Sequence, residues 1–142
     1  MRVVIVSGGF DPIHSGHIEH FKEAKKLGDI LIVGLNSDEW LTRKKGKPFM
    51  PIQERLAVIS ELRMVDSAVA FNDDNNSSID LIKKTLVLFD DVLFANGGDR
   101  TQDNIPEIDE FDKDPRVQFA FGVGGTHKQN SSSWILKQWN ST

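Results

Sequence analysis

Short runs of apolar, β-branched residues alternate along this chain with segments whose apolar residues recur at helical spacing. The runs at 2–6 and 30–35 lack the polar/apolar alternation of a sheet that has one face in water. We therefore expect them to be strands that are buried on both faces. Three further strands are predicted, at 67–71, within DVLFANGGD and within RVQFAFGVGG.

Local signals predict where several helices begin and end. Gly28 stands where the helix after the first strand would end on a glycine. Ser37 or Asp38 is expected to cap a short second helix, and the basic segment RKKGKPFMP that follows is expected to be a loop that cannot be helical. Pro51 is expected at the first position of the next helix.

Further helices are predicted over 79–85, within TQDNIPEIDEFDKD and over SSSWILKQW. Alternating strands and helices indicate an α/β fold, because parallel strands need crossover connections that cover both faces of the sheet. We expect a Rossmann-like, doubly wound sheet of about five parallel strands with helices on both faces. The 142 residues suit one domain, spanning 1–142.

Polar, glycine-rich loops follow three of the predicted strands. Their sequences are SGGFDPIH, NGGDR and GVGGTHKQNSSS. Because the carboxyl ends of parallel strands meet at one edge of the sheet, these loops should lie close together. Ligands bind at that edge in open α/β sheets, so the sequence predicts a site there.

Composition narrows the chemistry of this site. The formal net charge is −4, which argues against a broad nucleic-acid surface. The chain has no cysteine, which excludes disulfides, zinc–thiolate sites and thiol catalysis. No apolar stretch approaches the roughly 18 residues of a membrane span. We therefore expect a cytoplasmic protein with neither a nucleic-acid partner nor a membrane partner.

The first loop suits a phosphate ligand. Gly8 and Gly9 let a ligand approach the backbone closely, and the helix after them can direct free N–H groups at an anion. His14 and His17 lie three residues apart, so their rings can face the same way, with Gly16 between them. Alone, the two glycines also fit an ordinary tight turn, and a single histidine near a helix start is more often structural.

The segment GGFDPIHSGH resembles the HxGH signature of the nucleotidylyltransferase superfamily, and SSSWI at 131–135 resembles its second signature, ISSTxI. Between them, KGKPFMPIQERLAVISELRMVD and NGGD are similar to the branch of glycerol-3-phosphate cytidylyltransferases and heptose-phosphate adenylyltransferases. The resemblance implies transfer of CMP or AMP from CTP or ATP to a phosphorylated polyol or sugar. That acceptor would be glycerol-3-phosphate-like or heptose-phosphate-like, and pyrophosphate would be released.

The resemblance also implies roles for individual residues. We expect four residues to be catalytic by contacting phosphate oxygens; they are His14, His17, Lys44 and Arg55. Lys44 and Arg55 should lie on the solvent-exposed edge. Expected to bind the nucleotide are Gly8, Gly9, Phe10, Asp11, Asp99, Ser131, Ser132 and Ser133. Expected at the acceptor are Lys47, Arg100 and His127. The cofactor would be Mg²⁺, bridging triphosphate oxygens rather than held by side chains. The relatives imply a homodimer.

Departures from the family pattern leave both substrates open. Gly9 replaces a threonine usual in the cytidylyltransferases, and Leu136 replaces an arginine common in the adenylyltransferases. The segment GTHKQN replaces the Arg-Thr-Glu-Gly typical of glycerol-3-phosphate cytidylyltransferases. Two alternatives also remain: an adenylyltransferase for a cofactor precursor, of nicotinate mononucleotide or phosphopantetheine type, and a non-catalytic nucleotide-binding protein.

Overall fold

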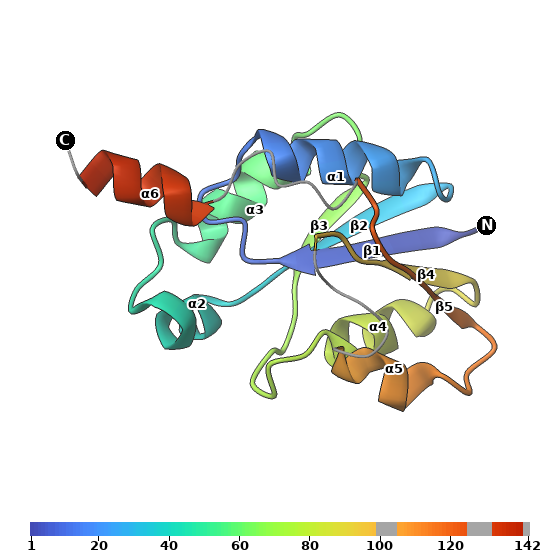
Figure 1. Ribbon diagram of the computed structural model, residues 1–142. Coiled ribbons are helices and arrows are strands. Elements are labelled where there is room, and N and C mark those ends of the chain that lie inside the picture. The colour runs from blue at the N-terminus through green and yellow to red at the C-terminus, as the bar shows by residue number, and fades with distance from the viewer. Residues whose placement is uncertain (99–104, 125–131, 141–142) are drawn as a thin grey trace.

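Five parallel strands form one sheet, in the order β3-β2-β1-β4-β5 (Figure 1). The computed structural model describes residues 1–98, 105–124 and 132–140. The strands are β1 (Val3–Gly8), β2 (Ile30–Leu35), β3 (Ser67–Ala70), β4 (Val92–Ala95) and β5 (Val117–Ala120). The helices are α1 (Ser15–Lys25), α2 (Asp38–Lys45), α3 (Ile52–Ser60), α4 (Ile79–Leu86), α5 (Pro106–Phe111) and α6 (Ser132–Asn140). The predicted α/β fold with a Rossmann-like parallel sheet is confirmed.

Helices cover both faces of the sheet, with α1 and α3 on one face and α4 and α5 on the other (Figure 1). Val4 and Val6 of β1 pack in the cluster that includes α1, while Val3 and Ile5 pack in the cluster that includes α4. All four side chains are 0% exposed. Successive side chains of a strand point to opposite faces, so a strand covered on both sides is apolar throughout.

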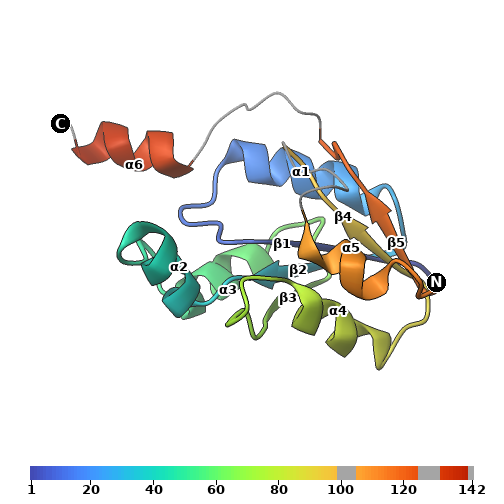
Figure 2. The same cartoon turned by 60° about the horizontal axis from the view of Figure 1, so that its bottom comes forward.

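The strand order reverses at β1, which pairs with β2 on one side and with β4 on the other. The chain builds β2 and β3 outward from β1 and then crosses back to build β4 and β5. In a doubly wound sheet this reversal opens a crevice beyond the carboxyl ends of the strands. Figures 1 and 2 both show α2 and α6 beyond this end of β1.

The prediction that RKKGKPFMP is a loop is wrong for its first three residues. Helix α2 continues to Lys45 and so includes Arg43 and Lys44. Arginine and lysine are good helix formers, and their charges are favourable at a helix carboxyl end. The helix ends at Gly46, which has a φ of 96°. Glycine adopts this conformation without the strain that a side chain would add.

Gly28 and Pro51 have roles other than those predicted. Helix α1 ends at Lys25, so Gly28 is not its cap. A Cβ on Gly28 would lie 2.7 Å from Val4 Cγ2, so the glycine allows close packing against β1. Pro51 is the N-cap residue of α3, one position before the predicted one.

Within the described parts of the chain, no helix has the length and apolar character that crossing a membrane requires.

Candidate active site

The side chains of His14 and His17 cap the amino-terminal end of α1. His14 Nδ1 accepts a hydrogen bond from Gly16 N at 3.1 Å, and His17 Nδ1 accepts one from His14 N at 3.2 Å. The two rings stack with their centroids 3.7 Å apart. A nitrogen that accepts from a backbone N–H carries no proton, so the proton of each neutral ring lies on Nε2. The pair therefore offers two Nε2–H donors beside the positive end of a helix.

His17 is neutral in the free protein near pH 7. Burial, followed by the nearby charges of His14 and His20, lowers the pKa of His17 to about 3. The Phe10 ring contributes to this burial, because it packs roughly perpendicular to the His17 ring with the centroids 4.9 Å apart. Phe10 was expected at the nucleotide. Phe10, a residue that is 6% exposed, packs in the core beneath the histidines, and its contact with a nucleotide stays a prediction.

His20, which the sequence analysis did not select, connects α1 to two of the glycine-rich loops. Its Nδ1 lies 2.8 Å from Val123 O. A Cβ on Gly97 would lie 3.0 Å from His20 Nδ1, and one on Gly124 would lie 3.1 Å from His20 Cα. The signal in the sequence was its position three residues after His17, on the same helix face.

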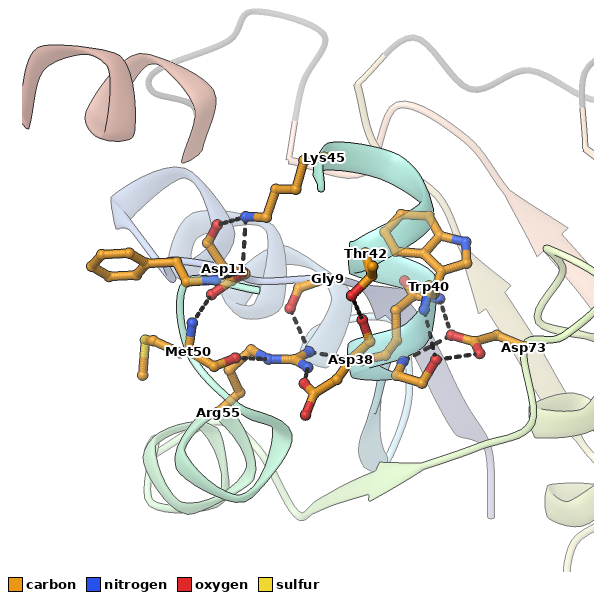
Figure 3. A network of polar contacts seen from close by, with 12 residues as sticks. Gly9, Asp11, Asp38, Trp40, Thr42, Lys45, Met50, Arg55 and Asp73 are labelled. Atoms are coloured by element: carbon orange, nitrogen blue, oxygen red, sulfur yellow. Dashed lines mark hydrogen bonds and ion pairs between the residues drawn. The ribbon is translucent and has the colours of Figure 1, made fainter. Parts of the chain in front are cut away.

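Asp11 connects the loop after β1 to the segment after α2 (Figure 3). Its carboxylate, in a residue 2% exposed, accepts from Phe49 N and Met50 N, both at 2.6 Å. Lys45 Nζ lies 2.8 Å from the same carboxylate and donates to Asp11 O at 2.6 Å. Protein donors thus occupy the group that was expected to face the nucleotide, so this geometry gives Asp11 a structural role.

Arg55 is not on the solvent-exposed edge, so that prediction is wrong. Arg55 is 1% exposed, and its guanidinium makes four hydrogen bonds within the protein (Figure 3). The acceptors are Met50 O at 2.9 Å, Gly9 O at 3.0 Å, Asn36 O at 2.7 Å and Asp38 Oδ1 at 2.7 Å. A buried guanidinium needs such partners because its charge has left water. The predicted phosphate contact of Arg55 has no support in this geometry.

Asp73, which the sequence analysis also did not select, binds the segment of residues 36–38 from the side opposite to Arg55 (Figure 3). Its carboxylate accepts from Asn36 Nδ2 at 3.0 Å, from Ser37 N at 2.8 Å and from Ser37 Oγ at 2.7 Å. Burial alone raises the pKa of Asp73, but the hydrogen bonds from Asn36 and Ser37 outweigh burial and leave this pKa below its ordinary value. The ionised Asp73 and the charged Arg55 therefore fix residues 36–38 between them.

Lys44 and Lys47 lie on the solvent-exposed surface at the end of α2 and just after it. Lys44 Nζ lies 4.7 Å from the centroid of the Trp40 ring. The contact between Lys45 and Asp11 places this end of α2 against the loop that precedes the two histidines. The exposure of Lys44 agrees with its expected position, while its contact with a phosphate stays a prediction.

Gly8, the last residue of β1, and Gly9, which follows it, both lie close to neighbouring side chains. A Cβ on Gly8 would lie 2.9 Å from Phe10 Cζ, and one on Gly9 would lie 3.0 Å from Leu41 Cδ2. A side chain introduced at either position would therefore meet a neighbouring ring or methyl group. Whether a ligand also approaches this backbone stays a prediction.

The second signature reaches the first through α6. Ser132 Oγ donates to Pro12 O at 2.7 Å, which joins the start of α6 to the loop before α1. Ser133 is exposed in the first turn of α6. The remaining predicted site residues lie outside the described residues; they are Asp99, Arg100, His127 and Ser131.

This chain is similar to proteins of known sequence and to a protein of known structure. The bifunctional protein HldE of Pelobacter propionicus is 35% identical over 142 residues, covering 98% of this chain and 28% of that protein. The same-named protein of Blochmanniella floridana is 43% identical over 106 residues, covering 73% of this chain and 21% of that protein. The chain thus spans less than a third of the length of these relatives.

The crystal structure of the lipopolysaccharide core biosynthesis protein from Thermoplasma volcanium GSS1 has a TM-score of 0.67 and 30% sequence identity to this chain. The match covers 85% of this chain and 95% of that one. The model of the family described as cytidylyltransferase-like matches residues 5–119, which run from within β1 to within β5 and so include all or part of every strand of the sheet. This chain therefore belongs to the cytidylyltransferase-like family of nucleotidyltransferases.

Proposed function

We propose that this protein transfers AMP or CMP from ATP or CTP to a sugar phosphate and releases pyrophosphate. The observation that carries this proposal is the stacked pair His14 and His17, whose two Nε2–H donors lie at the amino-terminal end of α1. Hydrogen-bond donors combined with a helix amino terminus suit the charged oxygens of a triphosphate.

The reaction needs no general base. The second pKa of a phosphate monoester is about 6, so the acceptor phosphate is largely a dianion at neutral pH. One of its oxygens forms a bond to the α-phosphorus. The bond from that phosphorus to the bridging oxygen breaks, and pyrophosphate leaves with the electron pair. The protein contributes by positioning the two substrates and by stabilising the charge on the phosphoryl oxygens.

The histidines act in this scheme as hydrogen-bond donors. The pKa of His17, lowered to about 3, leaves the ring neutral in the free protein, and a neutral imidazole is a poor acid. Lys44 supplies positive charge from the exposed end of α2. Arg55 acts indirectly, because it holds the backbone carbonyls of Gly9 and Asn36, which follow β1 and β2.

Mg²⁺ would enter the site with the triphosphate. Among the described residues, no group of three His, Cys, Asp or Glu side chains is arranged to hold a metal ion. Mg²⁺ in nucleotide enzymes commonly keeps several waters and takes phosphate oxygens as ligands. Its chemistry here would be to neutralise charge on the leaving pyrophosphate.

A sugar phosphate is favoured over glycerol 3-phosphate as the acceptor. The structural relative is named for the biosynthesis of a lipopolysaccharide core, which is a saccharide. The KGKPFMPIQERLAVISELRMVD segment is similar to the branch that holds both glycerol-3-phosphate cytidylyltransferases and heptose-phosphate adenylyltransferases, so it leaves the choice between ATP and CTP open. The homodimer and the cytoplasmic location stay predictions.

The test is to follow pyrophosphate release with each nucleoside triphosphate, Mg²⁺ and a panel of acceptors. The panel contains aldose 1-phosphates, heptose 1-phosphate, glycerol 3-phosphate, nicotinate mononucleotide and phosphopantetheine. We expect release with a sugar phosphate, and its loss in the His14→Ala/His17→Ala variant. Release with only nicotinate mononucleotide or phosphopantetheine would replace the proposal with the cofactor-precursor reaction. Nucleotide binding without any release would make the protein a non-catalytic binder.

A further inference from the structure

His20 lies on α1 three residues after His17, and its imidazole ring contacts the loop that follows β5. Nδ1 of His20 lies 2.8 Å from Val123 O. A carbonyl oxygen only accepts, so Nδ1 carries a proton and donates it in this hydrogen bond. In His14 and His17, by contrast, Nδ1 accepts from a backbone N–H within the first turn of α1. His20 therefore differs from the other two histidines of this helix, because its Nδ1 donates and joins α1 to a distant part of the chain.

The backbone of Val123 is held from two sides. Its N–H donates to Asn96 O, just beyond the end of β4, at 2.9 Å, and its carbonyl accepts from His20. Gly122 and Gly124, on either side of it, have φ values of 68° and 84°, which glycine adopts without strain. One residue thus joins three parts of the protein, which are α1, the loop after β4 and the loop after β5.

This junction has no room for additional side chains. A Cβ on Gly97 would lie 2.9 Å from Val123 O and 3.0 Å from His20 Nδ1. One on Gly124 would lie 3.1 Å from His20 Cα. The two loops therefore approach α1 through backbone atoms, at the ring of His20. Figures 1 and 2 both show the ends of β4 and β5 beside α1.

The junction lies close to the histidine pair. After burial and His14, the charge of His20 is the third cause that lowers the pKa of His17. The chain is also bound before α1, where Ser132 Oγ donates to Pro12 O at 2.7 Å. The pair therefore lies between two residues, Pro12 and His20, that hold the carboxyl-terminal part of the chain. Strand β4 pairs with β1, where the strand order reverses and where ligands bind in such sheets.

We propose that His20 is a positioning residue that holds the loops after β4 and β5 against α1 and thereby sets the affinity for the nucleoside triphosphate. The inference rests on the proposed function, because it assigns a residue to nucleotide binding in that reaction. Asp99, which is expected at the nucleotide, follows Gly98 directly in the sequence. A nucleotide that contacts these loops and the histidine pair together needs the loops at a fixed distance from α1. His20 sets that distance without touching the nucleotide itself.

Three variants separate the Nδ1 donor of His20 from its other properties. His20→Asn keeps an amide N–H near the position of Nδ1, and His20→Gln places one near the position of Nε2. His20→Leu keeps an apolar side chain of moderate size without a donor. Leucine and glutamine are better helix formers than asparagine, so a loss of helix stability alone would harm His20→Asn most. The positioning role predicts the opposite order for nucleotide binding.

Nucleotide affinity can be measured by calorimetry with the α,β-methylene analogues of ATP and CTP in the presence of Mg²⁺, because these analogues bind without nucleotidyl transfer. We expect at least one analogue to bind the parent. His20→Leu and His20→Gln should bind it about tenfold more weakly, and His20→Asn should stay within about threefold of the parent. The KM for the triphosphate should rise in the same proportion. The kcat should change by less than about threefold, because His14 and His17 keep their bonds within α1.

Gly97→Ala tests the same junction from the other side, because its Cβ would meet Val123 O and His20 Nδ1. It should weaken binding about as much as His20→Leu does. The double variant should lose little more than either single variant, since both changes disrupt one contact. Lys22→Asn, at an exposed position of α1, is the matched control for an asparagine in this helix and should bind as the parent does.

Nitrogen-15 NMR of the imidazole rings tests the geometry in the unmodified protein. At pH 8 we expect the proton of His20 on Nδ1 and the protons of His14 and His17 on Nε2. This measurement does not depend on whether a variant folds.

Three results would overturn the inference. They are a proton of His20 on Nε2, parent-like binding by His20→Leu, and recovery of binding in His20→Gln but not in His20→Asn. Failure of the proposed function alone gives a different result, because the analogues would then bind in a way that depends on His20 while no triphosphate released pyrophosphate. If neither analogue bound the parent, both the function and the inference would be overturned.

Discussion

Arg55 and Asp38 form an ion pair, with 2.7 Å between Nη2 and Oδ1, that joins the first turn of α3 to the first turn of α2. The Arg55 side chain is 0% exposed and that of Asp38 is 32% exposed, so the pair is largely shielded from solvent. Further hydrogen bonds from the same guanidinium reach Gly9 O and Asn36 O. One side chain thus sets the distance between the loop before the histidines and the segment of residues 36–38.

Arg55→Ala should therefore lower stability as well as activity. The change leaves three backbone carbonyls and one carboxylate without their donor, and we expect a loss of about 3 kcal/mol in the free energy of unfolding. Urea unfolding measures it. Arg63→Ala, at an exposed position, is the control and should change stability by less than about 0.5 kcal/mol. An Arg55→Ala variant with normal stability and a hundredfold loss of kcat/KM would place Arg55 at a phosphate instead.

Changes of His17 should separate capping from catalysis. His17→Ala removes both the cap of α1 and the Nε2–H donor, and it should cost about 1 kcal/mol of stability. Its kcat should fall about a thousandfold, roughly 4 kcal/mol, because the donor acts mainly as charge develops on the leaving pyrophosphate. Nucleotide affinity should change by less than about tenfold.

His17→Gln is the matched variant, since glutamine at the third helical position can also accept from the N-cap backbone N–H. Stability should recover, and its amide N–H should restore part of the rate. His14→Asn tests the partner in the same way, because asparagine is a favourable N-cap residue. Single-turnover kinetics, with nucleotide binding measured separately, distinguishes a loss of catalysis from a loss of binding. Normal turnover of His17→Ala would refute the proposed mechanism.

Stability should decrease as the pH falls from about 6.5 towards 3. The pKa of His17 is about 3 in the folded protein, against the ordinary histidine value of 6.5 in the unfolded chain, so the unfolded chain binds this proton first. His17 therefore contributes its full stabilisation above pH 6.5 and loses it through this window, with a slope of up to about 1.4 kcal/mol per pH unit. His17→Gln should flatten the slope between pH 5 and 6.5. An unchanged slope would contradict the buried, neutral state of His17.

Asp73→Asn should loosen the segment of residues 36–38. Asp73 accepts three hydrogen bonds from Asn36 and Ser37, and an asparagine would turn an amide donor towards one of them. We expect a loss of about 2 kcal/mol of stability, measured by urea unfolding. The exposed neighbour supplies the control, Asp74→Asn, which should leave the stability unchanged. A stability of Asp73→Asn equal to that of the parent would contradict the role of this carboxylate.

Lys44→Ala should lower kcat/KM by about a hundredfold, roughly 2.7 kcal/mol, without destabilising the fold. Lys44 is exposed, and its Nζ lies 4.7 Å from the centroid of the Trp40 ring, so we expect its removal to change stability little. Lys22→Ala, on the exposed side of α1, is the control for a general loss of positive charge. A Lys44→Ala variant as active as the parent would remove Lys44 from the site.

The sequence by itself determined the strands and the family, and it predicted the edge of the sheet at which we expect the site. The strands at Val3–Gly8 and Ile30–Leu35 could be predicted because both of their faces are buried, which requires apolar residues at nearly every position. The histidines could be found because the contacts that cap α1 join residues three apart or fewer, so their roles are visible in a short motif.

Only the tertiary structure showed which polar residues of the motifs are buried and bonded within the protein. Arg55 reaches Gly9 across 46 positions of sequence, and Asn36 reaches Asp73 across 37. Charged residues in a motif have the same letters whether they meet water, phosphate or a buried carbonyl, so the motif could not show that Arg55 and Asp11 are buried. His20 likewise reaches Val123 across 103 positions. This contact exists only once the parallel sheet has brought the ends of β4 and β5 beside α1.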